Sequence, residues 1–249
     1  MGGKLDDKVA LVTDGSSGIG FATAKQFVKE GAFVYVTGRR QAELDVAAKF
    51  LGNHAKAVHA EVSNLADLDA LYAQIGREQG RLDVLIADAG EALYAPLGQI
   101  TEQSFDHIFN TTVKSVLFTV QKALPLIPNG GAIVLKASTI SIKPVPAFGI
   151  YSAVKAAVRS FVRGWTKDLK DRKIRVNAVS PDLTNTEGLK DLAETCDKRY
   201  RFENPAAIFP LGRLGLPEEI AKAVVFLASN DASYITGVEL FVGSGRIWI

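Results

Sequence analysis

Short apolar runs that alternate with longer amphipathic stretches constrain the fold of this chain more than any other feature. The runs are nearly continuous in Val, Ile, Leu and Ala, which is typical of strands covered on both faces of a sheet. They are KVALVT from Lys8, FVYVT from Phe33, AKAVHA from Ala55, LDVLIA from Leu82, AIVLKA from Ala132, IRVNAVS from Ile174 and GVELFV from Gly237. Each run is therefore predicted to form a strand.

Helical spacing fills the stretches between these runs. The predicted helices span residues 18–30, 65–79, 101–127, 149–172 and 217–229. Strands that alternate with helices predict an α/β fold, a doubly wound parallel sheet of seven strands with helices on both faces. In this topology we expect the first five strands in the order 3-2-1-4-5.

The 249 residues contain no linker rich in Pro, Gly or Ser, and no repeat. We therefore expect one domain over residues 1–249. Residues 181–216 are the exception to the regular pattern, because they are mixed and charged. Ligands of open α/β sheets bind outside the carboxyl ends of the strands, so this segment is predicted to be a lid over a substrate site. A helical excursion without a role is the alternative.

Charge and cysteine content exclude several classes of function. Lys and Arg number 29 against 27 Asp and Glu, so a broad basic face for nucleic acid or an anionic membrane is not expected. A single cysteine excludes an internal disulfide and a Cys-rich zinc site. The three histidines are scattered, so no metal is expected. No apolar run is long enough for a membrane span or a signal-peptide core, and we expect a cytoplasmic protein.

A glycine-rich turn follows the first predicted strand and precedes a predicted helix. A strand, glycine turn and helix in this order allow the backbone to approach a pyrophosphate at the positive end of the helix. The residues expected to contact the phosphates are Gly15, Ser16, Ser17, Gly18, Ile19 and Gly20. An ordinary tight turn is the alternative.

Arg39 and Arg40 follow the second predicted strand. Proteins that select NAD generally place an acid there, whereas guanidinium groups suit the 2′-phosphate of NADP. The sequence therefore favours NADP(H) as cofactor, with NAD(H) as the second choice. Two arginines that only solvate a helix start are the alternative, although basic residues oppose the dipole at a helix N-terminus.

Tyr151 and Lys155 share one face of a predicted helix. A neighbouring ammonium lowers the phenol pKa from its usual value of about 10, giving an acid–base group suited to an alcohol or a carbonyl. A solvated helix pair is the alternative. Ser138 ends the fifth strand, where its hydroxyl is placed to hydrogen-bond a substrate oxygen. Asn110 lies inside a predicted helix, where it either faces solvent or bonds backbone and water in a relay.

These motifs, taken in order, resemble the short-chain dehydrogenase/reductase family over essentially the whole chain, and within it the 3-oxoacyl and carbonyl reductases. The resemblance implies a Rossmann-like fold, hydride transfer with NADP(H), and a homotetramer packed through residues 101–127 and 149–172. It implies that Tyr151 is the general acid/base, Lys155 tunes it and holds the nicotinamide ribose, Ser138 orients the substrate, and Asn110 sustains a proton relay. The further cofactor contacts that it implies are Glu61, Val62, Ala87, Ala89, Gly90, Pro181, Thr184 and Thr186.

The lining expected for the substrate pocket is largely apolar, from Leu93, Tyr94, Val145, Phe148 and the segment 181–216. This lining favours a small, partly hydrophobic carbonyl or alcohol over a highly charged substrate.

The chain departs from the family pattern at Asp14, Asp88, Asp182 and Lys136, where neutral residues are usual. Strands one, four and five are neighbours in the expected sheet, so Asp14, Asp88 and Lys136 are predicted to form an acid–acid–base cluster. Two hypotheses follow. One is an enzyme with an unusual cofactor rim, and the other is a protein with weakened or altered cofactor binding, which is either a binding or regulatory protein or an engineered variant. Retention of the serine, tyrosine and lysine favours the enzyme.

Overall fold

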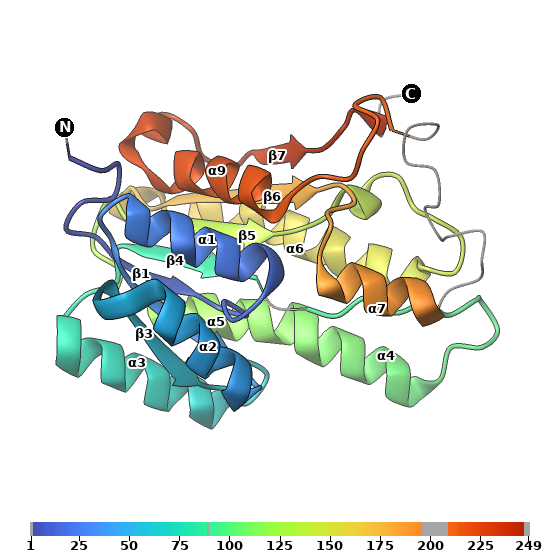
Figure 1. The fold of residues 1–249 in the computed structure, drawn as a ribbon, viewed down its shortest axis with the longest axis horizontal. Coiled ribbons are helices and arrows are strands. Elements are labelled where there is room, and N and C mark those ends of the chain that lie inside the picture. The colour runs from blue at the N-terminus through green and yellow to red at the C-terminus, as the bar shows by residue number, and fades with distance from the viewer. Residues whose placement is uncertain (1, 89, 196–208, 247–249) are drawn as a thin grey trace.

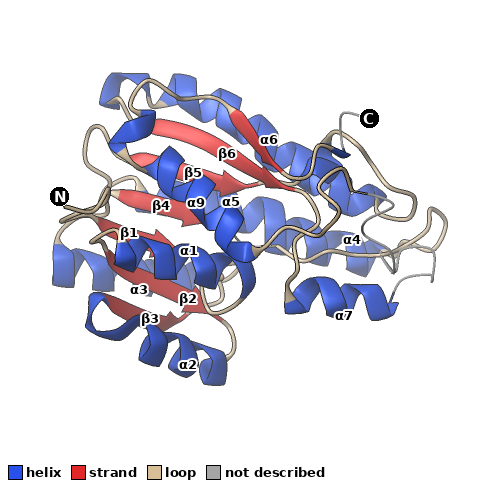
Figure 2. Cartoon of the chain, turned by 45° about the horizontal axis from the view of Figure 1, so that its top comes forward, coloured by secondary structure: helices blue, strands red, loops and turns tan. Residues whose placement is uncertain are grey.

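The computed structural model describes residues 2–88, 90–195 and 209–246. Its centre is a parallel sheet of seven strands in the order β3-β2-β1-β4-β5-β6-β7, and Figure 2 shows the strands as arrows that run the same way. The strands are β1 (Val9–Val12), β2 (Phe33–Gly38), β3 (Ala55–His59), β4 (Val84–Ala87), β5 (Ala132–Lys136), β6 (Arg175–Pro181) and β7 (Glu239–Val242). The predicted α/β fold, sheet and strand order are confirmed.

Helices cover both faces of the sheet, as Figure 1 shows. The core on one face includes side chains from α3 (Leu65–Gln79), α5 (Ser115–Ala123) and α6 (Gly149–Asp168). The core on the other face includes side chains from α1 (Gly18–Lys29), α2 (Gln41–Leu51) and α9 (Pro217–Ala228). The strands therefore bury apolar side chains in both directions, which accounts for their continuous apolar sequence.

Two helical regions differ from the sequence prediction. The sequence analysis did not predict α2, although Leu44, Ala47 and Leu51 recur at helical spacing and are buried. The single helix predicted at 101–127 is divided into α4 (Glu102–Phe109), a π-helical turn (Asn110–Lys114) and α5. In this region the hydroxyls of Thr111 and Ser115 hydrogen-bond backbone carbonyls one turn back, a contact that often accompanies a bent helix.

The carboxyl ends of the strands form the edge on which the candidate site lies. Val12 pairs with Ile86 and Ala87 with Leu135, so β1, β4 and β5 end side by side. Beyond β6, the segment predicted as a lid contains α7 (Glu187–Thr195), and Thr184 forms a bridge with Gly215. Residues 196–208 of that segment lie outside the described residues.

Candidate active site

The glycine-rich turn joins β1 to the start of α1. In the described structure, Ser17 is the N-cap of α1 without a side-chain capping bond, and the first turn of the helix holds no acidic residue. Gly18, the first helical residue, has a φ of +53°. A Cβ at Gly20 would lie 2.2 Å from the carbonyl oxygen of Asp14, so only glycine permits this close packing. The helix N-terminus is therefore available to an anion such as a pyrophosphate.

A cavity of about 60 Å³ lies beside this turn, where β2, β3 and β4 end. Its lining residues are Asp14, Thr37, Gly38, Arg39, Ala60, Glu61, Val62, Gly90, Glu91 and Thr111. The structure thus brings together several predicted cofactor contacts from segments distant in sequence. Ala87 is buried at the end of β4 in the apolar core, and Ala89 lies outside the described residues.

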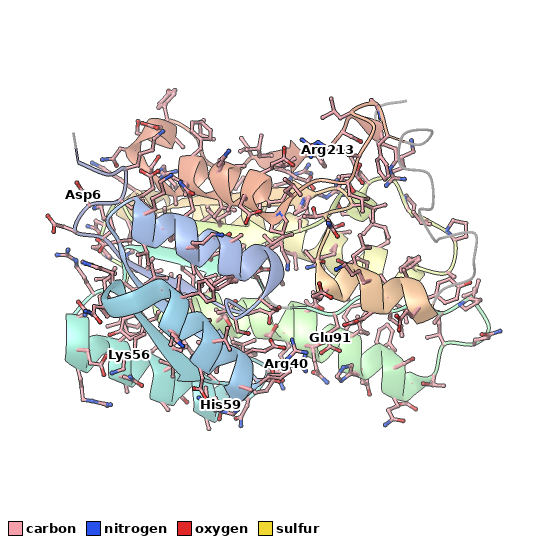
Figure 3. All side chains as sticks on the ribbon, viewed as in Figure 1. Asp6, Arg40, Lys56, His59, Glu91 and Arg213 are labelled. Carbon is pink, nitrogen blue, oxygen red and sulfur yellow. The ribbon has the colours of Figure 1, made fainter. Side chains whose placement is uncertain are left out.

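The two arginines after β2 are both ion-paired. Arg39 lies 2.5 Å from Glu91 and 3.5 Å from Glu61, and Arg40 lies 2.6 Å from Glu43. Figure 3 labels Arg40 and Glu91 between α2 and α4. The Nε2 atom of His107 also lies 3.1 Å from a carboxylate oxygen of Glu91. Glu91 was not among the predicted site residues, although an acid directly after Gly90 is expected at the same edge of the sheet as Arg39.

Ser138 and Tyr151 meet beyond the end of β5. Ser138 caps a short 3-10 turn (Thr139–Ser141), with its hydroxyl accepting a hydrogen bond of 3.4 Å from the Ile140 amide. Tyr151 lies in the first turn of α6. Desolvation raises the pKa of the Tyr151 phenol to about 12, and a hydrogen bond with Ser138 opposes the rise. At neutral pH the phenol is therefore protonated.

Lys155 lies one helical turn beyond Tyr151, and its side chain is buried, with 1% of the residue exposed. Its ammonium lies 5.8 Å from the centroid of the Tyr151 ring and donates a hydrogen bond of 3.1 Å to the Lys136 carbonyl. Burial, then the charge of Lys136, lowers the pKa of Lys155 to about 7, while Asp14 opposes this shift. Gly90 packs close by, because a Cβ there would lie 3.4 Å from the Lys155 Nζ.

The predicted relay residue, Asn110, begins the π-helical turn and is exposed. Among the described residues, no contact joins Asn110 to Lys155. Thr112 is instead fully buried, and a Cβ at Gly90 would lie 2.9 Å from its hydroxyl oxygen. That oxygen has no hydrogen-bond partner in the described structure. The sequence analysis missed Thr112 because a π turn changes which residues face the sheet.

Known proteins share both the sequence and the fold of this chain. The profile of the family described as enoyl-(acyl carrier protein) reductase matches residues 15–246. Oxidoreductase asL5 of Sarocladium schorii is 43% identical, over 97% of this chain and 96% of its own length. The chain belongs to the short-chain dehydrogenase/reductase family. It is thus an oxidoreductase of a family that uses nicotinamide cofactors, as the sequence predicts.

Two further relatives agree with this assignment. The 3-oxoacyl-(acyl-carrier-protein) reductase FabG of Thermotoga maritima is 34% identical, over 98% of this chain and 99% of its own. A crystal structure of a short-chain dehydrogenase/reductase, glucose/ribitol dehydrogenase, from Brucella melitensis matches with a TM-score of 0.92 at 28% identity, covering 100% of both chains. Membership of a family of enzymes does not favour the hypothesis of a non-catalytic binding protein.

The charged residues that depart from the short-chain dehydrogenase/reductase pattern form the predicted cluster. Asp88 follows β4, is 2% exposed, and pairs with the Lys136 ammonium at the end of β5. The Asp88 amide donates a hydrogen bond of 2.9 Å to the Thr13 hydroxyl. Burial lowers the pKa of Lys136, and Asp14 opposes this shift. Asp14 itself is exposed with a φ of +52°, a conformation that Asp tolerates better than most residues.

Asp182, the remaining departure, lies apart from this cluster. It is buried directly after β6, and its carboxylate accepts a hydrogen bond of 2.9 Å from Arg246 and one of 3.4 Å from the Thr139 hydroxyl. Its charge is therefore offset by Arg246, which also lies 5.6 Å from the centroid of the Phe209 ring. Arg246 was not among the predicted site residues, since nothing in the local sequence pattern joins it to Asp182.

The remaining predicted cofactor contacts follow β6. Pro181 ends the strand, and the hydroxyl of Thr184 donates a hydrogen bond of 2.8 Å to the Asp182 carbonyl. The Thr186 hydroxyl accepts a hydrogen bond of 3.2 Å from the Leu189 amide at the start of α7. A Cβ at Gly18 would lie 3.5 Å from the Thr186 methyl group. The structure thus brings Thr186 to the start of α1.

A larger cavity of about 550 Å³ lies on another face of α6. Its lining residues are Ala95, Leu97, Ile100, Phe105, Phe109, Pro144, Val145, Pro146, Ala147, Gly149, Ile150 and Ala153. At about 100° per residue, Gly149, Ile150 and Ala153 point away from the side of the helix that carries Tyr151 and Lys155. Of the predicted pocket residues, Val145 lines this cavity, whereas Tyr94 and Phe148 contact each other with ring centroids 5.5 Å apart.

The residues at the sheet edge fit a nicotinamide dinucleotide. The uncapped start of α1 suits the pyrophosphate, and the small cavity beside it joins the segments after β2, β3 and β4. Ser138 and Tyr151 lie beyond β5. In the described parts of the chain, no helix is long and apolar enough to cross a bilayer. The same parts contain no group of three or more His, Cys, Asp or Glu placed to hold a metal ion.

Proposed function

We propose that this chain is an NADP(H)-preferring reductase or dehydrogenase of a small, partly hydrophobic carbonyl or alcohol. The observation that carries the proposal is the meeting of Ser138, Tyr151 and Lys155 at the carboxyl edge of the sheet, beside the uncapped start of α1. NADPH, when bound, supplies the hydride for reduction of the carbonyl carbon. The chain's own residues supply orientation and the proton.

The phenol of Tyr151 and the hydroxyl of Ser138 are placed to hold the substrate oxygen between them. The pKa of Tyr151, raised to about 12, lies far above neutral pH, as does the ordinary pKa of a phenol, so the proton is in place before reduction starts. That proton passes to the substrate oxygen and leaves a phenolate, which the ammonium of Lys155 stabilises to the extent that it is charged. Because the reactants are held together in this geometry, the reaction no longer depends on a bimolecular encounter, and its activation barrier is lower. Asn110 as relay residue stays a prediction.

The preference for NADP(H) rests on the guanidinium groups of Arg39 and Arg40. A 2′-phosphate there must replace carboxylates, since Glu91 and Glu61 pair with Arg39 and Glu43 pairs with Arg40. A phosphate carries more charge than a carboxylate and accepts bidentate hydrogen bonds from arginine. Substitution of both arginines by Ala should therefore weaken NADPH binding much more than NADH binding.

We further propose a cytoplasmic homotetramer, one domain to each subunit, that packs through residues 101–127 and 149–172, which include α4, α5 and α6. Phe105 is 43% exposed and stacks on Phe109 with ring centroids 4.3 Å apart, and both line the large apolar cavity between these helices. An apolar surface of this kind is usual at a subunit interface. Residues 181–216 act as the lid over the substrate, and nucleic acid and membranes are not partners.

The test is turnover of a panel of aliphatic and aromatic ketones with NADPH, by the unaltered chain and by Tyr151→Phe. Loss of the proton donor should lower kcat by about a hundredfold or more, with NADPH affinity within about twofold. Tyr234→Phe is the matched control, because Tyr234 is fully exposed and precedes β7, at the amino ends of the parallel strands. Turnover by Tyr151→Phe at the rate of the control would overturn the proposed function.

A further inference from the structure

Glu91 pairs with the arginine on which the preference for NADP(H) rests. It follows β4 and lines the small cavity together with Arg39 and Asp14. The preceding residue, Gly90, packs so closely on Thr112 that a Cβ there would lie 2.9 Å from the threonine hydroxyl oxygen. The backbone that carries Glu91 is therefore held at the edge of the sheet where we place the 2′-phosphate.

The two carboxylate oxygens of Glu91 have different partners. Oε1 accepts a hydrogen bond of 2.5 Å from Nη2 of Arg39, and Oε2 lies 3.1 Å from Nε2 of His107 in α4. Partial burial raises the pKa of Glu91, but the hydrogen bonds from His107 and Arg39 outweigh burial, and the pKa lies below its ordinary value. Glu91 is therefore a carboxylate at neutral pH, and it links the segment after β2 to α4.

Glu61 is the other acid that pairs with Arg39, but its carboxylate is bound to its own loop. Oε1 of Glu61 accepts hydrogen bonds of 3.1 Å and 2.9 Å from the amide and the hydroxyl of Ser63. Its Oε2 lies 3.5 Å from Arg39, whereas the pair between Glu91 and Arg39 is shorter, at 2.5 Å. Of these two acids, Glu91 is therefore the stronger competitor for the guanidinium.

A 2′-phosphate and the Glu91 carboxylate require the same donor. Both are anions that accept charge-assisted hydrogen bonds from a guanidinium, so a phosphate bound to Arg39 lies beside a carboxylate that has lost this partner. NAD(H) carries a hydroxyl at the same ribose position and meets no such repulsion. His107 stays within 3.1 Å of Glu91, so the displaced carboxylate keeps one of its two partners.

We propose that Glu91 is a specificity-determining residue, which binds Arg39 in place of the 2′-phosphate and so limits the preference for NADP(H) over NAD(H). This inference rests on the proposed function, because that function assigns the 2′-phosphate to Arg39. NADPH has to displace a carboxylate that NADH leaves in place. The chain should therefore bind both cofactors, with a ratio of affinities that depends on residue 91.

The direct test compares the unaltered chain with Glu91→Gln in titrations with NADPH and with NADH, followed by nicotinamide fluorescence at low salt. Glutamine keeps the length of the side chain and removes its charge. For a carboxylate and a phosphate about 5 Å apart in water, this loss of charge should tighten NADPH binding about tenfold, with NADH affinity within about twofold. An unchanged ratio of NADPH affinity to NADH affinity would overturn the inference.

Two further variants separate competition for Arg39 from a general effect of charge. In an Arg39→Ala background, Glu91→Gln should change the affinity ratio by less than about twofold, because no guanidinium remains to compete for. An undiminished effect in that background would contradict the inference. Glu218→Gln is the matched control, since it removes one negative charge from an exposed pair with Lys25 outside the cavity, and its affinity ratio should equal that of the unaltered chain.

These titrations distinguish failure of the inference from failure of the proposed function. If both cofactors bind and Glu91→Gln has the affinity ratio of the unaltered chain, only the inference fails. If both cofactors bind with the expected change in ratio but no ketone is reduced, only the proposed function fails, because the titrations need no reaction. Binding of neither dinucleotide by the unaltered chain or by any variant would overturn the cofactor site on which both rest.

Discussion

Lys155→Met tests the protonation state of the buried lysine through protein stability. The pKa of Lys155 is lowered from its ordinary value of 10.5 to about 7 in the folded chain, chiefly by burial. The unfolded chain therefore binds this proton more tightly than the folded chain, so the Lys155 contribution to stability rises with pH between about 7 and 10.5. Below about pH 7 the full cost of the buried charge is present.

A methionine carries no charge, so burying it does not cost this free energy. The difference in free energy of unfolding between Lys155→Met and the unaltered chain must therefore depend on pH. Integration of the linkage relation from pH 6 to pH 10 with these two values gives about 4 kcal/mol. The variant should gain most in free energy of unfolding at pH 6, and its advantage should fall by about this amount at pH 10.

Urea unfolding at equal protein concentration, followed by circular dichroism at several pH values, measures this difference. Lys122→Met should show a nearly constant difference from the unaltered chain, because its partner Asp69 has a side chain that is 65% exposed to solvent. If the gain in free energy of unfolding of Lys155→Met stays constant or grows with pH, the pKa of Lys155 is not lowered in the folded chain.

Three other predictions concern neighbouring groups. Thr112→Val should leave stability unchanged or raise it by about 1 kcal/mol in urea unfolding, since the buried hydroxyl lacks a partner in the described structure; a loss of 2 kcal/mol would show that a partner exists. Asp14→Gly should tighten NADPH binding about tenfold at low salt by removing a like charge, and equal affinities in a fluorescence titration would contradict that repulsion. Arg246→Ala should lower the free energy of unfolding by about 1–3 kcal/mol because Asp182 loses its buried partner, whereas an unchanged urea midpoint would show that the pair contributes nothing.

The sheet was predictable because each strand is buried on both faces and must be apolar throughout. Once the order of the strands is known, the ends of β1, β4 and β5 are neighbours, so the pairing of Asp88 with Lys136 follows from position in the sequence. Strand order alone does not predict the meeting of Ser138 and Tyr151, because Tyr151 lies in α6. That contact was expected from the resemblance to the family.

Contacts that depend on helical phase or on distant loops could not be predicted. The π turn at Asn110–Lys114 changes the phase of the helix, so a regular period gives no reason to expect Asn110 exposed and Thr112 buried. The pair between Asp182 and Arg246 joins residues 64 apart through two irregular segments. Arg39 was predicted as a phosphate ligand, but its contacts with Glu61 and Glu91 depend on side-chain geometry at the strand ends.

Departures from the family pattern change the charge of the site, whereas the serine, tyrosine and lysine of the family motif are retained. Lys136 offsets Asp88, and Arg246 offsets Asp182, so both buried carboxylates have a cationic partner. Asp14 is the acid that remains exposed beside the start of α1. We therefore expect Asp14, rather than Asp88 or Asp182, to be the substitution that weakens cofactor binding.

Titration of the unaltered chain with NADPH and with NADH, followed by nicotinamide fluorescence, tests the central claim most directly because it needs no substrate. The account predicts saturable NADPH binding with a dissociation constant in the micromolar range and weaker binding of NADH. Replacement of Arg39 and Arg40 by Ala should remove most of the difference between the two cofactors. Failure of the unaltered chain to bind either dinucleotide, at low salt and at high protein concentration, would contradict the assignment of this edge of the sheet as a nicotinamide cofactor site.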